Sequence, residues 1–398
     1  MTGLPPRTAT LVLCLPDGTL LGALPPLHVQ FPYWQAAGPL VEAARTAHGL
    51  DVTVLRLLDA EREDGCGGRV TYLAEVAAPV DGLLPWAEPL DESPLRLPYA
   101  RPGGPAADLA WADAALLGLG RPRTGPAEQV RTWNLSSLWR LPTARGAAWL
   151  KVVPPFFAHE GRVIERLGPA VAPPLLATEG PRVLLDEVPG EDLYEATGPV
   201  LLEMVSLLCD LQASWTGRVP ELLELGVADW RAPTLVPLAQ AALERVADQL
   251  DPATRATCRR LVDGLPERFV ALDACGVPDT LVHGDFYPGN LRGDGTRLVL
   301  LDWGDCGVGN PLLDRAAFLD RIPADQRQVV RARWDDVWRS AVPGCDPVRA
   351  GQLVEPVAAL RQAVLYDGFL RRIEPSERRY HATDPATWWR TAAQLLRP

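Results

Sequence analysis

The chain has 398 residues, of which 47% are hydrophobic and 22% charged, a composition typical of a globular protein with two or three domains. Its net charge of −11, from 39 basic and 50 acidic residues, argues against a general binder of nucleic acid or anionic membranes. No apolar run approaches the ~18 residues of a membrane span, and the N-terminus lacks a signal-peptide pattern. Seven scattered cysteines without a C-x-x-C pair favour reduced thiols, so we expect a cytoplasmic protein.

Residues 1–100 are expected to form a small α/β domain. Strands are predicted over 8–21 around an Asp-Gly turn and over 52–58 and 69–76, with an Ala-rich helix at 40–48. This order resembles a Nudix domain. That family carries a cluster of metal-binding Glu side chains on the helix, whereas this helix offers only Glu42. We therefore expect a Nudix-like domain without its catalytic box, serving as a structural or substrate-gating module.

The rest of the chain is predicted to contain a linker and two further regions. Pro- and Gly-rich residues 101–125 are expected to form a linker with one helix at 106–119. Residues 126–189 are β-rich, and residues 190–398 are mostly helical by pattern. The elements predicted in the β-rich region are strands at 133–141, 147–153 and 182–188 and a helix at 157–167.

Lys151 is the single lysine among 39 basic residues, and it lies in a predicted strand flanked by apolar residues. A half-buried ammonium is costly unless it meets an anion, and phosphate oxygens with a helix carboxylate would provide one. Glu160, in the following helix, is the first choice for the ion-pair partner, and Glu165 is the alternative. Chance survival of one lysine, with both glutamates solvated, is the competing interpretation.

The most informative motif is a loop that carries His283, Asp285 and Asn290, followed by Asp302 after an apolar run. The spacing His-x-Asp-x-x-x-x-Asn matches the catalytic loop of protein kinases, with Gly284 where those enzymes carry Arg. It predicts phosphoryl transfer, with Asp285 accepting the proton of a hydroxyl and with Asn290 and Asp302 holding Mg²⁺.

Several neighbouring residues are given supporting roles. His283 is expected to fix the loop by hydrogen bonds, and Asp305 is interpreted as a turn residue rather than a metal ligand. The stretch 134–140 occupies the place of a phosphate-covering loop, where Ser136 and Ser137 would offer donors to phosphate. Backbone groups of Glu187 and Val188, just before a Pro-Gly pair, are expected to meet an adenine edge at a hinge between lobes.

Together these motifs resemble the aminoglycoside phosphotransferase and choline kinase superfamily over about residues 126–398. Gly284 and the Asp302-Trp303 pair are features of that family rather than of protein kinases. The resemblance implies an α+β, bilobal kinase-like fold with a small β-rich N-lobe (126–189) and a large helical C-lobe (190–398). It also implies ATP or GTP as donor, Mg²⁺, a small-molecule hydroxyl as acceptor, and Asp314 as a brace for the catalytic loop.

Two departures from the family pattern leave the acceptor open. Gln212 stands where relatives often have His, and the first 125 residues lie outside the family module. Acceptor-site candidates in the C-lobe, each with core packing as the alternative, are Trp215, Trp230, Tyr366, Asp367, Glu374 and Trp388.

The sequence therefore predicts an ATP- and Mg²⁺-dependent kinase of a small-molecule hydroxyl, on an aminoglycoside-like antibiotic or a related metabolite. The alternative is a nucleotide-binding regulatory pseudokinase whose N-terminal domain binds a partner. A protein kinase is disfavoured, because the loop arginine and the Asp-Phe-Gly and Ala-Pro-Glu signatures are absent from the sequence.

Overall fold

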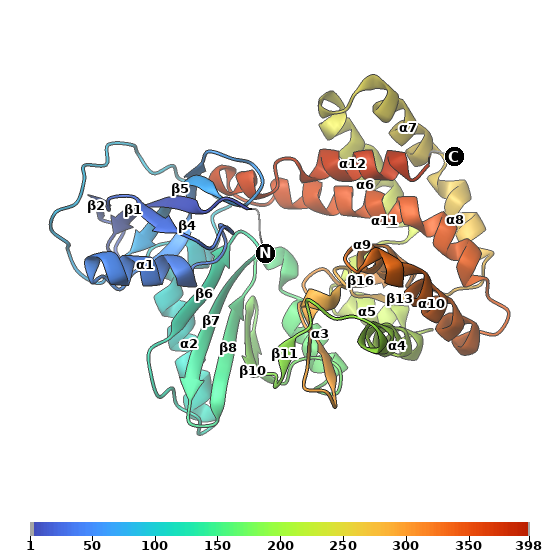
Figure 1. The fold of residues 1–398 in the computed structure, drawn as a ribbon, viewed down its shortest axis with the longest axis horizontal. Coiled ribbons are helices and arrows are strands. Elements are labelled where there is room, and N and C mark those ends of the chain that lie inside the picture. The colour runs from blue at the N-terminus through green and yellow to red at the C-terminus, as the bar shows by residue number, and fades with distance from the viewer. Residues whose placement is uncertain (1–3, 397–398) are drawn as a thin grey trace. The chain divides into compact units, whose positions relative to one another are not determined.

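The computed structural model describes residues 4–396, which divide into two compact units (Figure 1). The strand-rich unit comprises the chain up to Gly161 together with Leu175–Glu187 and Gly368–Thr383. The helical unit comprises Arg162–Pro174, Val188–Asp367 and the chain from Asp384 onward. The chain therefore passes between the units five times, and neither unit is a single continuous segment.

The N-terminal sheet of the strand-rich unit has the order β2-β1-β5-β4, and β3 pairs with β1. Strands β1 and β5 run parallel, while the other pairs are antiparallel. Its elements are β1 (Arg7–Cys14), β2 (Leu20–Ala23), β3 (Leu27–Val29), α1 (Gly38–His48), β4 (Thr53–Ala60) and β5 (Gly68–Glu75). Strand β3 is the element that the sequence did not predict.

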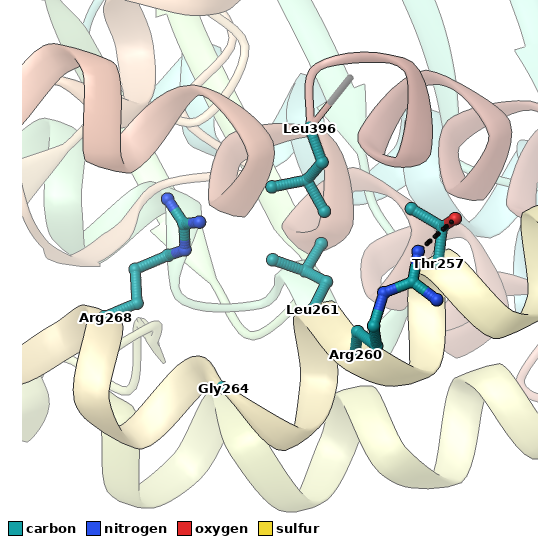
Figure 2. Close-up of a pocket in the computed structure, with 6 residues that line it drawn as sticks. All are labelled: Thr257, Arg260, Leu261, Gly264, Arg268 and Leu396. Carbon is teal, nitrogen blue, oxygen red and sulfur yellow. Dashed lines mark hydrogen bonds between the residues drawn. The ribbon is translucent and has the colours of Figure 1, made fainter. Parts of the chain in front are cut away.

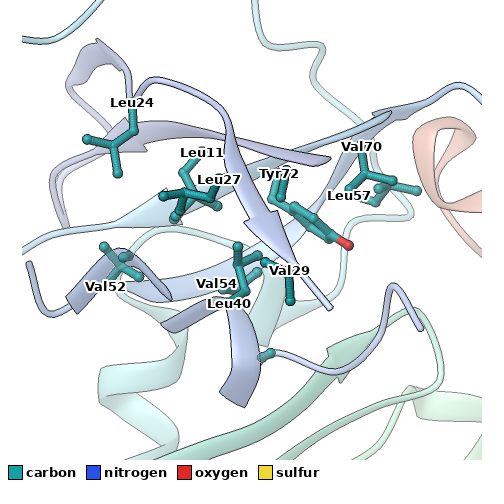
Figure 3. Packing of buried hydrophobic residues seen from close by; sticks show 14 of the residues in the cluster. Leu11, Leu24, Leu27, Val29, Leu40, Val52, Val54, Leu57, Val70 and Tyr72 are labelled. Carbon is teal, nitrogen blue, oxygen red and sulfur yellow. The ribbon is translucent and has the colours of Figure 1, made fainter. Parts of the chain in front are cut away.

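The apolar face of α1 packs against this sheet (Figure 3). Leu40 on the helix and Leu11, Val54 and Tyr72 on the strands are all almost fully buried in one cluster. Burial of alternate strand residues and of one helix stripe is what the sequence pattern requires. Whether this domain is related to Nudix proteins stays a prediction.

The central sheet of the same unit has the order β6-β7-β8-β10-β9. Its strands are β6 (Glu128–Trp133), β7 (Ser136–Thr143), β8 (Gly146–Val152), β9 (Leu175–Glu179) and β10 (Arg182–Asp186). Helix α2 (Gly104–Gly118) buries Ala112 and Leu116 in one cluster with Leu141 and Leu150 of the sheet. The expected linker at 101–125 is therefore largely a packed helix, because its apolar residues cover the central sheet.

Residues 368–383 belong to the strand-rich unit, although the sequence assigned them to the helical C-lobe. The Leu57 amide donates to Glu377 Oε1 (2.6 Å), and Asn134 Nδ2 donates to the Glu377 carbonyl (3.0 Å). The Tyr380 ring makes edge contacts with Trp34 and Trp133. This segment thus bonds to the N-terminal sheet and to the turn between β6 and β7, and it makes them one unit.

The helical unit is built mainly of helices α4 to α12, with α3 (Glu160–Leu167) beginning in the other unit. The helices are α4 (Pro199–Ser214), α5 (Val219–Glu224), α6 (Ala232–Val246), α7 (Pro252–Asp263), α8 (Leu265–Asp273), α9 (Leu313–Asp320), α10 (Arg327–Ala341), α11 (Pro347–Leu370) and α12 (Asp384–Gln394). The short 3-10 helices η3 (Ala247–Gln249), η4 (Pro288–Asn290) and η5 (Ala324–Gln326) belong to this unit. The other three, η1 (Pro98–Ala100), η2 (Pro155–Phe157) and η6 (Pro375–Tyr380), belong to the strand-rich unit.

Two small sheets, β11-β14-β15 and β12-β16-β13, complete this unit. Their strands are β11 (Glu191–Asp192), β12 (Ala228–Asp229), β13 (Thr280–Val282), β14 (Leu291–Gly293), β15 (Leu298–Leu300) and β16 (Gly307–Gly309). Between residues 4 and 396, no helix has the length and apolarity needed to cross a membrane.

Candidate active site

Strand β13 delivers the loop 283–290 from the interior of the helical unit. All three of its residues are buried, and it pairs antiparallel with β16. The Thr280 hydroxyl donates to the Gln212 carbonyl of α4 (2.6 Å). The loop therefore starts from a fixed point in the core, which is what a site that must hold its geometry requires.

Asp314, on the first turn of α9, braces the start of the loop. Its carboxylate accepts the backbone amides of His283 and Gly284 (2.8 Å each) and Gln212 Nε2 (2.9 Å). Burial raises the pKa of Asp314, while His283 and the two amide donors act against that rise. Gln212, where a histidine was expected from the resemblance, thus provides a side-chain hydrogen-bond donor to Asp314.

The ring of His283 ties the loop to the strand that precedes Asp302. Its Nε2 lies 3.0 Å from the Leu301 carbonyl, and its Nδ1 lies 3.4 Å from the Asp285 amide. Because the carbonyl can only accept, we assign the ring proton to Nε2, which leaves Nδ1 to accept from the amide. This arrangement fits the supporting role expected for His283.

Gly284 has a backbone conformation and a setting that no other residue fits. Its φ is +90°, and a Cβ there would lie 2.1 Å from the Asp305 carbonyl oxygen. The arginine of the protein-kinase motif is therefore excluded at this position. Buried Arg361 of α11 instead donates to the carbonyls of Gly284 (3.0 Å) and Asp305 (3.2 Å), a contact that no local motif announces.

Asp285 and Asn290 face each other across the loop. Asn290 Nδ2 donates to Asp285 Oδ2 (2.9 Å) and to the Asp285 carbonyl (2.8 Å). The side-chain nitrogen of Asn290 therefore donates its hydrogen bonds to Asp285. The side-chain oxygen, Oδ1, is the Asn290 atom that is left to bind a cation.

A backbone hydrogen bond next to the β14–β15 pair brings the residue before Asp302 to Asn290. The Leu301 amide donates to the Asn290 carbonyl (2.8 Å), beyond the β14–β15 ladder that pairs Leu291 with Leu300. Asp302 has a φ of 60°, and within residues 4–396 it is the sole non-glycine residue with positive φ. Such strain persists where the surroundings impose it, often at functional sites. Asp305 lies in a turn, as expected.

These oxygen donors fit Mg²⁺, which favours carboxylate and amide oxygens and commonly takes further ligands from phosphates. In the described part of the chain there is no group of three His, Cys, Asp or Glu side chains arranged to hold a metal by themselves. A cation at Asn290 and Asp302 would therefore rely on phosphate oxygens or water for the rest of its shell.

Lys151 and Glu160 form an ion pair in the strand-rich unit, with 2.7 Å between Nζ and Oε1. The side chains are 14% and 1% exposed, so both are largely removed from water. Lys151 lies in β8, paired with Leu138 on one side and Val183 on the other, and Glu160 begins α3. Glu165, the alternative partner, is exposed.

The turn between β6 and β7 lies where the covering loop was expected over residues 134–140, but it is shorter and comprises only residues 134 and 135. Strand β7 already begins at Ser136, because Ser136 and Ser137 pair with Trp133 and Thr132 of β6. Both serines are buried, and their hydroxyls accept ring N–H bonds from Trp133 (3.2 Å) and Trp139 (3.0 Å). Any contact of the two serines with phosphate stays a prediction.

The expected hinge coincides with a passage of the chain between the units, between Glu187 and Val188. The Glu187 amide donates to the Ala147 carbonyl (3.2 Å), and the Val188 carbonyl accepts from Arg292 (3.2 Å). The Glu187 carbonyl and the Val188 amide are not used in these bonds.

Most acceptor-site candidates have structural partners instead. Trp215 packs against Arg166 and Arg218, Trp230 packs against Arg361, and Asp367 pairs with Arg245. Glu374 was placed wrongly, since it lies in the strand-rich unit and pairs with Arg96 (3.0 Å). Trp388 is partly buried on α12. Burial raises the pKa of Tyr366, and whether Tyr366 lines an acceptor site stays a prediction.

No motif in the sequence points to Arg321, which binds the Asp285 carboxylate. Its Nη1 is 2.9 Å from Asp285 Oδ1, and its guanidinium lies 4.2 Å from the centre of the Tyr287 ring. It is the residue directly after α9, outside every recognised motif.

One pocket of about 260 Å³ lies elsewhere in the helical unit (Figure 2). It is lined by Leu261 and Leu396 with Arg260 and Arg268, and Arg260 turns to the Thr257 hydroxyl (3.0 Å). None of the candidate site residues lines it, so it is separate from the catalytic loop.

A family comparison agrees with this geometry. The sequence profile of the "Phosphotransferase enzyme family" matches residues 129–350, which is more than half of the chain. The chain belongs to this family. The match includes Lys151, Glu160, the whole catalytic loop and Asp314, and it leaves the N-terminal sheet outside. No curated protein sequence matches the chain.

The fold is shared with two solved structures at low sequence identity, and a third structure is similar to a lesser degree. A candidate aminoglycoside phosphotransferase from Ralstonia eutropha is 16% identical with a TM-score of 0.51, covering 73% of this chain and 97% of its own. A choline/ethanolamine kinase family protein from Mesorhizobium loti is 16% identical with a TM-score of 0.50, covering 72% and 98%. A macrolide 2′-phosphotransferase from Brachybacterium faecium is 18% identical, with a TM-score of 0.46 and coverage of 73% and 98%. The predicted α+β, kinase-like fold is confirmed.

Proposed function

We propose that this phosphotransferase-family protein transfers the γ-phosphoryl group of ATP or GTP to a hydroxyl of a small molecule. The proposal rests on one observation. Asp285 stands on a loop braced by Asp314, with one carboxylate oxygen fixed by Asn290. A fixed carboxylate is suited to accept the proton of a hydroxyl that attacks a phosphoryl group.

Asn290 and Asp302 would hold Mg²⁺, which when bound supplies positive charge to the transferring phosphoryl group. The commitment of the Asn290 amide nitrogen to Asp285 supports this role, because it leaves the oxygen for the cation. The left-handed backbone of Asp302 supports it as well, because such strain often occurs at functional sites.

Lys151 would bind phosphate oxygens of the nucleotide while Glu160 holds its ammonium in place. The low exposure of both side chains supports this role, because a buried ammonium needs strong anionic partners. The Glu187 carbonyl and the Val188 amide would hydrogen-bond the edge of the nucleobase. The N-terminal sheet carries none of these groups, and we assign it a structural role.

The test compares Asp285→Asn with the wild type. Asn keeps the shape of the side chain but cannot take up a proton, so transfer should fall about 10²- to 10⁴-fold. Nucleotide affinity, measured by calorimetry with Mg²⁺ and ATP, should change little, because the base acts mainly in the transition state. Transfer is measured as ADP release over sugars, amino alcohols, nucleosides and aminoglycosides.

Asp336→Asn is the matched control, because Asp336 is an exposed aspartate of the helical unit that pairs with neighbouring Arg339. Its turnover should equal that of the wild type. Full turnover by Asp285→Asn would remove Asp285 from the role of base. Nucleotide binding by the wild type without transfer to any acceptor would favour the regulatory pseudokinase.

A further inference from the structure

Helix α9 contacts the catalytic loop at two places. Asp314, in its first turn, binds the backbone of the loop, and Arg321, directly after its last residue, binds the Asp285 carboxylate. The two residues are seven positions apart, a spacing that places side chains on the same helix face after two turns. One face of α9 thus holds both the loop and its catalytic side chain.

Arg321 completes the orientation of the base. Asn290 donates to Oδ2 of Asp285 and Arg321 donates to Oδ1, so the two donors together fix the carboxylate plane. The ring of Tyr287 lies against the guanidinium and limits its movement. Each carboxylate oxygen can accept more than one hydrogen bond, so the acceptor hydroxyl can still reach the base while Arg321 stays bound.

The guanidinium has donors to spare. Within residues 4–396, Nη1 on Asp285 is its one hydrogen bond, which leaves Nε and Nη2 available, and the side chain is 40% exposed. A group that reacts with Asp285 must therefore bring its neighbouring atoms close to these N–H donors. Oxygen lone pairs can accept from them, whereas an ammonium has no lone pair and carries the same charge.

We propose that Arg321 is a positioning residue for Asp285 and a specificity-determining residue that selects acceptors with an oxygen beside the reacting hydroxyl. Polyols, sugars and hydroxy acids have such an oxygen, whereas simple amino alcohols present an ammonium instead. This inference rests on the proposed function. In the transfer, the hydroxyl proton moves to Asp285, the new O–P bond forms and the bond to the departing nucleoside diphosphate breaks. Arg321 keeps its proton throughout.

Another ion pair of the helical unit offers a matched control. Arg331 and Glu355 are 2.8 Å apart with side chains 45% and 27% exposed, against 2.9 Å, 40% and 28% for Arg321 and Asp285. Exposed pairs of this kind contribute little to folding stability. A difference between the Arg321 and Arg331 variants would therefore report on the reaction rather than on the fold.

The experiment measures kcat and KM for the wild type, Arg321→Gln, Arg321→Lys and Arg331→Gln. The acceptors are inositol and glucose as polyols, glycerate as a hydroxy acid, and ethanolamine and choline as amino alcohols. The wild type should use the polyols or the hydroxy acid at least tenfold more efficiently than the amino alcohols. Arg321→Gln should lower kcat about tenfold for every acceptor and raise KM only for the polyols and the hydroxy acid.

Arg321→Lys should recover most of kcat, because an ammonium still pairs with Asp285, but not KM, because the additional donors of the guanidinium fork are lost. Arg331→Gln should match the wild type. Equal constants for Arg321→Gln and Arg331→Gln would overturn the proposal, and so would a wild type that prefers the amino alcohols. If the wild type phosphorylates no acceptor of any class, the proposed function fails and the role of Arg321 fails with it, a result distinct from the other two.

Discussion

Two buried carboxylates, Asp314 in the helical unit and Glu377 in the strand-rich unit, accept backbone amides from distant parts of the chain. Asp314 uses both oxygens, for two loop amides and Gln212. Glu377 uses Oε1 for the Leu57 amide, and in the described chain no hydrogen-bond partner faces Oε2. One site satisfies its carboxylate fully and the other does so only in part.

This difference in hydrogen bonding corresponds to two different roles for a buried carboxyl group. Asp314 has enough donors to hold a catalytic loop in one geometry. Burial raises the pKa of Glu377 to about 8, against a smaller opposing effect of the Leu57 amide. Glu377 is therefore mainly protonated at neutral pH, and its ionisation at higher pH would place a buried charge at the contact between the N-terminal sheet and residues 368–383.

The largest effect is expected from Asp314→Ala. The change leaves two amides and Gln212 without their acceptor in a buried site, which should lower the free energy of unfolding by about 3–5 kcal/mol. Transfer should also fall, because the start of the loop loses its brace. Urea denaturation and ADP release measure the two effects, with Asp336→Ala as the exposed control. An equal stability of the two variants would contradict the role of Asp314.

An intermediate effect on stability, which develops between about pH 4.5 and 8, is expected from Glu377→Gln. The folded pKa of Glu377 lies above its unfolded value, so its contribution to stability is complete below about pH 4.5 and is lost as pH rises through about 8. The wild type should thus lose stability across this window, by on the order of a few kcal/mol, relative to the glutamine variant.

Denaturation of both proteins at pH 5, 7 and 9 measures this difference, and comparison with the variant cancels the titration of all other groups. Gln should keep the bond to the Leu57 amide, so the two proteins should be similar at pH 5. Parallel stability curves from pH 5 to 9 would show that Glu377 does not titrate in this range.

The smallest effect is expected at Gln212. Replacement by Leu removes one of the three donors to Asp314 and should lower the free energy of unfolding by about 1–2 kcal/mol. Replacement by His should cost less, because an imidazole N–H can donate in place of the Gln212 amide. A leucine variant as stable as the wild type would show that two amides suffice for Asp314.

The parts of the molecule that could be predicted are those with local signals. The strands around the Asp-Gly turn, helix α1 and the loop from His283 to Asn290 follow from alternation, periodicity and fixed spacing. The pairing of Lys151 with Glu160 could be anticipated because a lone lysine on an apolar strand requires an anion nearby.

The parts that could not be predicted depend on pairing across long stretches of sequence. Arg361 reaches Gly284 from 77 residues away, and Glu377 reaches Leu57 from 320 residues away. Neither Arg361 nor Glu377 stands in a motif. The role of each depends on a partner that is distant in sequence, and not on the residues next to it in the chain. Arg321 is similar, since only the path of α9 brings it to Asp285.

The place of residues 368–383 has a consequence for synthesis on the ribosome. The N-terminal sheet emerges first, but its bond from Leu57 to Glu377 cannot form until almost the whole chain has been made. Contacts between such distant residues slow folding, and surfaces awaiting them stay open in the meantime. The nascent N-terminal sheet is therefore expected to keep the surface that meets Glu377 exposed until residues 368–383 have been made.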